Sequence, residues 1–320
     1  MKENYKIKTI PEIPEINDRN LRLIRYTQNI YDGLKKFVRI NPDSMEIVDF
    51  RIKSPVGNIP ARIYYPGRTR TDGNLHSALM FLHGGGFVMG SIGTHDGICK
   101  KLAEKTGRIV VSAAYRLAPK HIYPSAIRDS YCVYYYLCKN SEALRIDRSD
   151  IAIGGTSAGG NIALGVMEMC LRRKKRGVIP SAIVLQYPLT DIESVLMGDF
   201  TESALENADG RTLTLDAMTR MLRYYIPYFE IEDGIESPHL LGNPYLSPVK
   251  SELMFQYPRV IMISAGKDIL RDDNRNFAEA MASNGVEFEH HEYKKMLHAF
   301  MSFDSGETEM AFNQIAEFLE

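Results

Sequence analysis

Ser157 lies at the centre of the five-residue pattern G-T-S-A-G, which spans residues 155–159. A β-branched run at 151–153 precedes this pattern, and a stretch of helix-forming composition at 161–173 follows it. A serine at a sharp turn between a strand and a helix holds its hydroxyl clear of the sheet, where a base can reach it. The pattern therefore predicts a nucleophilic serine. A Gly/Ser-rich connecting loop without a catalytic role is the alternative interpretation.

Three consecutive glycines, at 84–86, follow His83 and a continuous apolar run at 78–82. Glycines in a row are costly to order, so they indicate a place where backbone N–H groups must point into a site. Such donors stabilise the negative charge that develops on a carbonyl oxygen under attack. A phosphate-binding loop would continue with G-K-S or G-K-T, which this stretch lacks. The loop therefore favours acyl transfer, with a merely flexible loop as the alternative.

Asp268 is the first acidic residue after the apolar run at 260–264, which predicts a strand. An acid at the carboxyl end of a parallel strand lies on the edge of the sheet where active sites form. Asp272 and Asp273 compete with it, and either is also a candidate N-cap for the helix predicted at 274–283.

His298 lies in a loop between the strand predicted at 287–293 and the final helix predicted at 307–319. Imidazole changes its protonation state near neutral pH, which suits it to take a proton from a serine. The remaining histidines lie within or before predicted strands, at the start of the glycine loop, or outside any motif: His76, His83, His95, His121, His239, His290 and His291. His298, in its loop position, is therefore a candidate base.

The elements that must position these residues alternate between strands and helices. Alternating apolar and polar residues at 45–53, a turn, and a second strand at 59–65 predict an antiparallel hairpin at a sheet edge. Continuous apolar runs predict buried strands at 78–82, 108–113, 151–153, 182–187 and 260–264. Helices are predicted at 17–38, 124–138 and 161–173. The pattern is typical of the α/β class.

Residues 189–245 interrupt this alternation. Within them, a helix predicted at 214–229 has an apolar face formed by Leu215, Met218, Leu222, Tyr225 and Phe229. Such a face must be buried against another part of the protein. The segment is either a cover over the site or an ordinary peripheral helix.

Four motifs follow one another along the chain: H-G-G-G at 83–86, Y-R-L-A-P at 115–119, G-T-S-A-G-G at 155–160 and N-P-Y-L-S-P at 243–248. Together with the later aspartate and histidine, they resemble the hormone-sensitive lipase-like family of α/β-hydrolase carboxylesterases, over about residues 45–320. The order Ser, Asp, His is that of α/β hydrolases. One departure is Thr156, where many members carry an acidic residue; this is similar to the threonine-bearing branch of the family.

The resemblance implies an α/β-hydrolase fold, in which a mostly parallel central sheet is flanked by helices and covered by a helical cap. Residues 45–188 and 246–320 are expected to form the hydrolase core. Residues 1–44 and 189–245 are expected to form the cap. The family pattern places the catalytic acid at the first aspartate, which selects Asp268 over Asp272.

The resemblance also implies the roles of the site residues in a serine carboxylesterase that acts through an acyl-enzyme, without a metal or cofactor. Ser157, His298 and Asp268 are expected to form the triad. The expected oxyanion donors are the N–H groups of Gly85, Gly86 and Ala158, and the expected pocket residues are Phe87, Met218, Met221 and Tyr225. The absence of a large exposed apolar patch favours soluble small-molecule esters with short to medium acyl chains.

Two other functions use the same scaffold. An amidase or peptidase would use the same triad, and matched ester and anilide substrates would separate it from an esterase. A non-catalytic small-molecule receptor is the second alternative, because plant hormone receptors resemble this family. Such receptors typically lose the histidine, so His298 favours turnover.

Composition limits the binding partners and the cellular compartment that we expect. The 320 residues carry a formal net charge of −1, which gives no indication of nucleic-acid binding. The sequence shows neither an apolar signal segment nor a run long enough to span a membrane. The four cysteines lack metal-ligand spacing and are expected to be free, buried thiols, which favours a reduced, cytoplasmic setting. A homodimer is left open.

Overall fold

The computed structural model describes residues 45–55, 57–173, 179–227 and 240–320. The helix predicted at 17–38, and with it the predicted cap segment 1–44, lies outside the described residues. Within the described part, no helix is both long and apolar enough to cross a membrane.

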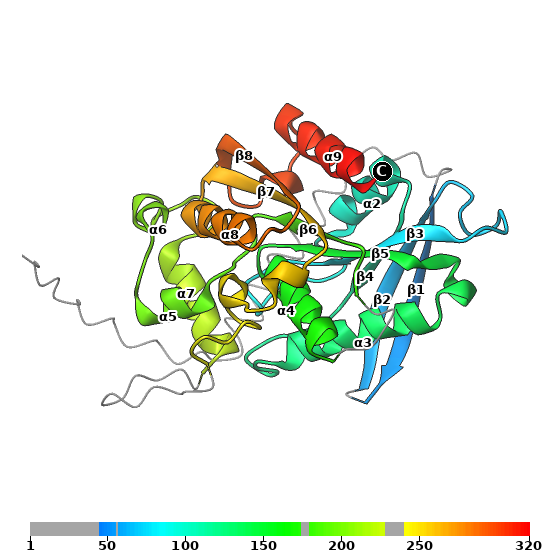
Figure 1. Cartoon of the computed structure of the whole chain (residues 1–320), viewed down its shortest axis with the longest axis horizontal. Helices are drawn as coiled ribbons and strands as arrows, with labels where there is room; N and C mark the ends of the chain where they lie inside the picture. Colours follow the sequence, from blue (N-terminus) through cyan, green and yellow to red (C-terminus); the bar gives the residue numbers. More distant parts are fainter. Residues whose placement is uncertain (1–44, 56, 174–178, 228–239) are drawn as a thin grey trace, which may run out of the picture.

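Eight strands form one sheet in the described part of the chain, in the order β1-β2-β4-β3-β5-β6-β7-β8 (Figure 1). Their bounds are β1 Met45–Ser54, β2 Gly57–Pro66, β3 His76–Leu82, β4 Ile109–Ala113, β5 Ile146–Thr156, β6 Ala182–Gln186, β7 Arg259–Lys267 and β8 Phe288–Leu297. The pairs β1–β2 and β2–β4 are antiparallel, whereas the other neighbours are parallel. The predicted hairpin at the sheet edge is thus confirmed.

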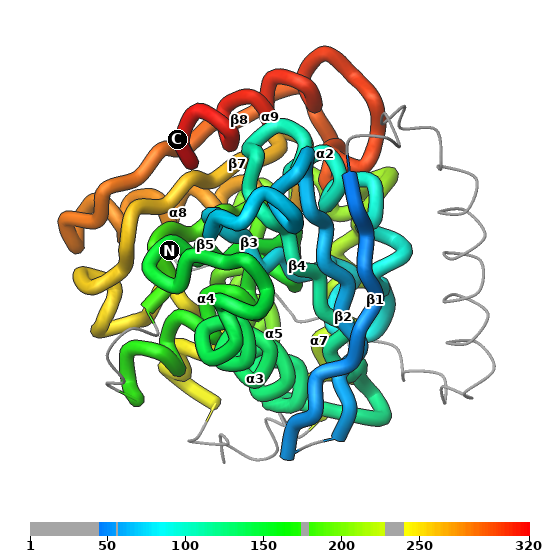
Figure 2. The backbone as a smooth tube through the Cα atoms, turned by 90° about the vertical axis from the view of Figure 1, so that its right-hand side faces the viewer, coloured from blue at the N-terminus to red at the C-terminus, as the bar shows by residue number. Residues whose placement is uncertain are grey.

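Helices cover both faces of the sheet. Helices α2 (Asp96–Thr106) and α9 (Gly306–Leu319) lie on one face, and α3 (Ser125–Lys139), α4 (Ala158–Arg172) and α8 (Arg271–Ser283) lie on the other (Figures 1 and 2). Along β3, Leu79 and Phe81 pack toward α2 and α9, while Met80 and Leu82 pack toward α3 and α4. Burial on both faces explains why the central strands have continuous apolar sequences.

Three helices occupy the chain between β6 and β7: α5 (Ile192–Met197), α6 (Glu202–Glu206) and α7 (Leu215–Tyr225). They gather at one end of the molecule (Figure 1). The Thr214 hydroxyl caps α7 by accepting a hydrogen bond from the N–H of Ala217. The predicted helix at 214–229 therefore begins where expected but ends four residues early, and Phe229 lies outside the described residues. The sequence analysis did not predict α5 and α6.

Short 3₁₀ turns connect several of these elements, at Glu142–Leu144, Pro248–Lys250, Met254–Gln256 and Phe300–Ser302.

Asn161, in the first turn of α4, ties together both ends of the segment that carries α5 to α7. Its side-chain amide donates to the carbonyl oxygens of Leu189 and Leu246, at 2.9 Å in each case. Asn161 is completely buried, so these carbonyls depend on it in place of water. The segment therefore leaves and re-enters the core beside the helix that follows Ser157.

Asn161→Ala should lower the free energy of unfolding by about 2 kcal/mol or more, because it leaves two buried carbonyl groups without a donor. Denaturant unfolding measures this change. Asn284→Ala is the matched control, because Asn284 is exposed and its amide bonds the Ala280 carbonyl of its own helix; this change should stay within about 0.5 kcal/mol. Equal effects of the two substitutions would show that Asn161 does not tie together the two ends of this segment.

Candidate active site

The predicted triad residues and the glycine loop, which begins at His83, follow directly after the carboxyl ends of parallel strands. His83 follows β3, Ser157 follows β5, Asp268 follows β7 and His298 follows β8. Carboxyl ends of parallel strands meet at one edge of a sheet, where α/β proteins place their sites. Leu297 pairs with Lys267 at the end of the β7–β8 ladder, so the next residues on the two strands, His298 and Asp268, emerge side by side.

Ser157 has φ 51° and ψ −119°, a backbone conformation that costs a non-glycine residue energy. Its N–H donates to the Gln186 carbonyl at 2.9 Å. A Cβ on Gly155 would lie 2.5 Å from the Gly159 backbone, and one on Gly159 would lie 2.2 Å from the Leu82 carbonyl oxygen. Both flanking glycines are therefore required by close packing. Helix α4 starts at Ala158, immediately after the serine, and not at 161 as predicted.

Ser157, His298 and Asp268 are joined by hydrogen bonds. The Nε2 atom of His298 lies 3.0 Å from Ser157 Oγ, and its Nδ1 lies 2.7 Å from Asp268 Oδ2. Asp268 is 2 % exposed, and its other oxygen accepts from the N–H of Leu270 at 3.0 Å. A carboxylate accepts only, so Nδ1 carries the proton of the neutral ring. Nε2 is then free to accept the serine proton.

The competing acids lie elsewhere. Asp272 accepts from the N–H of Ser203 at 2.8 Å and pairs with Arg271, so it links α8 to α6. Asp273 is buried and accepts from the N–H of Thr190 at 2.7 Å. The prediction that one of them caps α8 is wrong, because that helix begins earlier, with Leu270 at the N-cap and both aspartates in the first turn.

The glycine loop lies beside Ser157. Gly85 and Gly86 have φ values of 117° and 57°, in the region that favours glycine. The Gly85 carbonyl accepts from the N–H groups of Val88 and Met89, which closes the loop. Among the described residues, the N–H groups of Gly85, Gly86 and Ala158 have no acceptor. They are therefore available to an oxygen of a bound molecule.

A cavity of about 860 Å³ opens onto the serine. Ser157 and His298 line it, together with the glycine loop and residues of α7. Phe87, Met218 and Met221 belong to its wall. Tyr225 corrects the prediction: it is completely buried and stacks on Phe87, with ring centroids 4.0 Å apart, so it supports the wall from behind.

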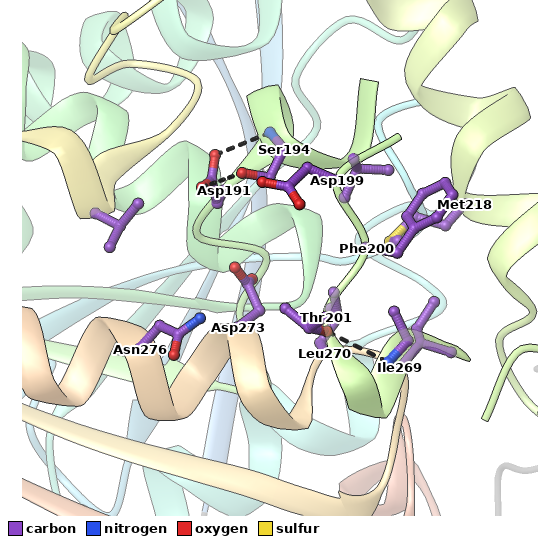
Figure 3. Close-up of a pocket in the computed structure, with 13 residues that line it drawn as sticks. Asp191, Ser194, Asp199, Phe200, Thr201, Met218, Ile269, Leu270, Asp273 and Asn276 are labelled. Atoms are coloured by element: carbon purple, nitrogen blue, oxygen red, sulfur yellow. Dashed lines mark hydrogen bonds between the residues drawn. The ribbon is translucent and has the colours of Figure 1, made fainter. Parts of the chain in front are cut away.

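A second cavity of about 220 Å³ adjoins the first one. Met218 and Leu270 line both cavities, so these two side chains lie between them. Figure 3 shows Asp273 pointing from α8 into the second cavity, opposite Asp191 and Asp199. Burial, assisted by nearby carboxylates, raises the pKa of Asp273 to about 7. The far side of the Met218 wall is thus more polar than its near side.

Two residues that the sequence analysis did not select also lie at the site. The ring of Tyr187 meets that of His298 edge-on, with centroids 5.0 Å apart. Tyr187 follows β6 directly, and this position at a strand end was the signal that could have identified it. His95 contacts both the glycine loop and Thr156; it lies outside any motif. In the described residues, no group of three His, Cys, Asp or Glu side chains is placed to hold a metal ion.

Comparisons with known proteins agree with this geometry. Residues 79–302 match the family described as alpha/beta hydrolase fold. The esterase LipI of Mycobacterium tuberculosis is 34% identical over 267 residues, which cover 82% of this chain and 77% of that protein. The carboxylesterase NlhH of the same organism is 34% identical over 248 residues, covering 77% and 72%. The structure of a hyperthermophilic esterase from the archaeon Pyrobaculum calidifontis has a TM-score of 0.81 and 31% identity, covering 93% and 92%.

The two candidate acids can be separated with an alkyl fluorophosphonate, which labels activated serines. Asp268→Asn should slow labelling of Ser157 by about 10⁴-fold, because the amide no longer fixes the proton on Nδ1 of His298. Asp272→Asn should keep labelling within about tenfold of the unmodified protein. Mass spectrometry follows the rates, and thermal unfolding confirms that both variants are folded. A slower reaction in Asp272→Asn than in Asp268→Asn would show that the acid is misassigned.

Proposed function

The chain belongs to the α/β-hydrolase fold family, and on that basis we propose that it is a serine carboxylesterase for small soluble esters with short to medium acyl chains. The observation that carries the proposal is the hydrogen-bonded series Ser157, His298 and Asp268 at the wall of a cavity. The esterase and carboxylesterase relatives support the same reaction class. The helices α5 to α7, within residues 189–245, are assigned as the cap, and the remaining described elements as the core.

Acylation begins when Nε2 of His298 takes the hydroxyl proton of Ser157 as Oγ attacks the ester carbonyl carbon. Asp268 holds the ring in position and stabilises the imidazolium that forms. The carbonyl oxygen becomes an oxyanion, which accepts from the free N–H groups of Gly85, Gly86 and Ala158. The imidazolium then returns the proton to the departing alkoxide. An alcohol and an acyl-enzyme result.

Deacylation repeats these steps with water in place of the serine. His298 removes a proton from the water, whose oxygen attacks the acyl carbon and forms a second oxyanion in the same position. When this collapses, the imidazolium protonates Ser157 Oγ and the acid is released. His298 thus returns to Ser157 the proton that it takes from water, and the triad ends in its starting state.

The cytoplasmic setting is also part of the proposal. Cys99, Cys132, Cys138 and Cys170 are free thiols, with Cys132 only half-buried where a buried one was expected. Unpaired cysteines are typical of proteins that fold in a reducing compartment.

Ser157→Ala should lower kcat for a p-nitrophenyl ester by about 10⁶-fold while the fold is retained, because it removes the attacking oxygen. Stopped-time assays with the purified protein measure this loss, and circular dichroism checks the fold. The same acyl group presented as a p-nitroanilide should react far more slowly in the unmodified enzyme. A well-folded Ser157→Ala protein with near-normal esterase activity would refute the nucleophile, and a faster anilide would identify an amidase.

The chain-length limit should depend on Met218. Each methylene that fits the cavity stabilises the bound ester by about 0.8 kcal/mol, and methylenes beyond its end add nothing. Met218→Ala opens the first cavity toward the second, so the optimum of kcat/KM across a p-nitrophenyl series from acetate to palmitate should move to longer chains. Met310→Ala, at an exposed methionine, is the control.

An unchanged optimum in folded Met218→Ala would show that this side chain does not end the acyl pocket. A maximum at palmitate in the unmodified enzyme, or activation by an oil–water interface, would overturn the proposed substrate class.

A further inference from the structure

His95 lies between the glycine loop and the turn that carries Ser157. Its Nε2 atom is 3.1 Å from the N–H nitrogen of Gly84 and 2.9 Å from the hydroxyl oxygen of Thr156. Gly84 directly precedes the proposed oxyanion donors, and Thr156 directly precedes the nucleophile. One imidazole nitrogen therefore joins the two backbone segments whose separation decides whether an oxyanion is bound.

The hydrogen-bond partners of His95 determine where its proton lies. The Thr94 hydroxyl is 2.8 Å from the Ser91 carbonyl, which accepts only, so the Thr94 proton is used there. Nδ1 of His95, 2.8 Å from the same hydroxyl, must then be the donor. Nε2 is left with a lone pair, as the Gly84 N–H requires. The Thr156 hydroxyl consequently donates to Nε2 as well.

Gly84 also packs directly against the serine turn. A Cβ at this position would lie 2.8 Å from the Thr156 hydroxyl oxygen and 3.4 Å from Cβ of Ser157. Thr156 is 3 % exposed, so its hydroxyl has His95 as partner in place of bulk water. The contact has little tolerance for displacement in either direction.

We propose that His95 and Thr156 form a positioning pair, which sets the N–H groups of Gly85 and Gly86 against the oxyanion formed at Ser157. This inference rests on the proposed esterase function. Both residues line the cavity beside Ser157, and the pair acts on the oxyanion through Gly84 rather than by contact with the reacting atoms. A displacement of about 1 Å in catalytic groups costs on the order of 10²-fold in rate, which is the effect that the pair prevents.

The pair also accounts for the threonine before the nucleophile. A hydroxyl can donate to the unprotonated Nε2 alongside the Gly84 N–H. A carboxylate at 156 would instead require a proton on Nε2, which would then face the N–H of Gly84, a second donor. Threonine and the Nδ1-protonated form of His95 are thus mutually consistent.

The test compares His95→Leu, His95→Gln, Thr156→Val and the double variant His95→Leu/Thr156→Val in steady-state hydrolysis of a p-nitrophenyl ester. His95→Leu should lower kcat by about 10- to 100-fold with little change in KM, because the loss falls on the oxyanion. Glutamine, whose carbonyl oxygen can accept from the Gly84 N–H, should recover most of kcat. The double variant should be no slower than His95→Leu, since the two residues act as a unit.

A second readout does not need catalysis. Amide hydrogen exchange in the peptide containing residues 84–90 should accelerate in His95→Leu and not in the control His76→Leu, whose ring pairs with Asp72 at the surface. Full kcat in His95→Leu, failure of His95→Gln to recover it, or unchanged exchange in the loop would overturn the positioning role. An unmodified protein that hydrolyses no ester would overturn the proposed function instead, which the exchange measurement distinguishes.

Discussion

The backbone of Ser157 is the constraint on which the rest of the site depends. Its positive φ is unfavourable by about 1–3 kcal/mol for a residue with a side chain, so the surrounding structure must hold it. The Gln186 carbonyl fixes its N–H, and its own carbonyl accepts from the N–H of Gly160 at 2.9 Å. Because the strand and helix on either side touch through Gly155 and Gly159, the serine has little room to relax. The proposed nucleophile is therefore fixed at the end of β5, and the other groups must approach it.

Among the groups that must approach Ser157, His298 follows the most distant strand. Strands β6 and β7 lie between β5 and β8, which places the ends of β5 and β8 about 14 Å apart at ordinary strand spacing. Ala299, with φ 62°, and the 3₁₀ turn at Phe300–Ser302 turn the chain away from the line of β8 directly after His298. Tyr187, directly after the intervening β6, contacts the imidazole edge-on.

Much of this arrangement could be predicted from the sequence because it depends on local patterns. The apolar runs located the central strands along the chain, and the G-T-S-A-G and H-G-G-G patterns after two of them identified Ser157 and the glycine loop. The exceptions depended on contacts that no local pattern contains. Tyr225 has the spacing of a pocket residue, but the Phe87 ring covers it. Asp272 and Asp273 resemble helix caps, but α8 begins at Arg271 and uses their carboxylates in other contacts.

The glycine loop is held from two sides, and one of them is α7, a helix of the proposed cap. On one side, His95 and Thr156 fix Gly84. On the other, α7 packs so closely that a Cβ on Gly86 would lie 2.2 Å from Sδ of Met221. The N–H of Tyr123 donates to the Tyr225 carbonyl at 2.9 Å, which anchors the end of α7 to the core.

Helix α7, which lines the pocket, therefore also packs against the loop that carries the proposed oxyanion donors. A displacement of α7 moves Met221 against Gly86, so an acyl chain that forces the pocket open also disturbs the N–H groups beside it. The fit of the substrate in the pocket and the stabilisation of the oxyanion therefore both depend on the position of α7. Poorly fitting esters should lose rate in the chemical step as well as in binding.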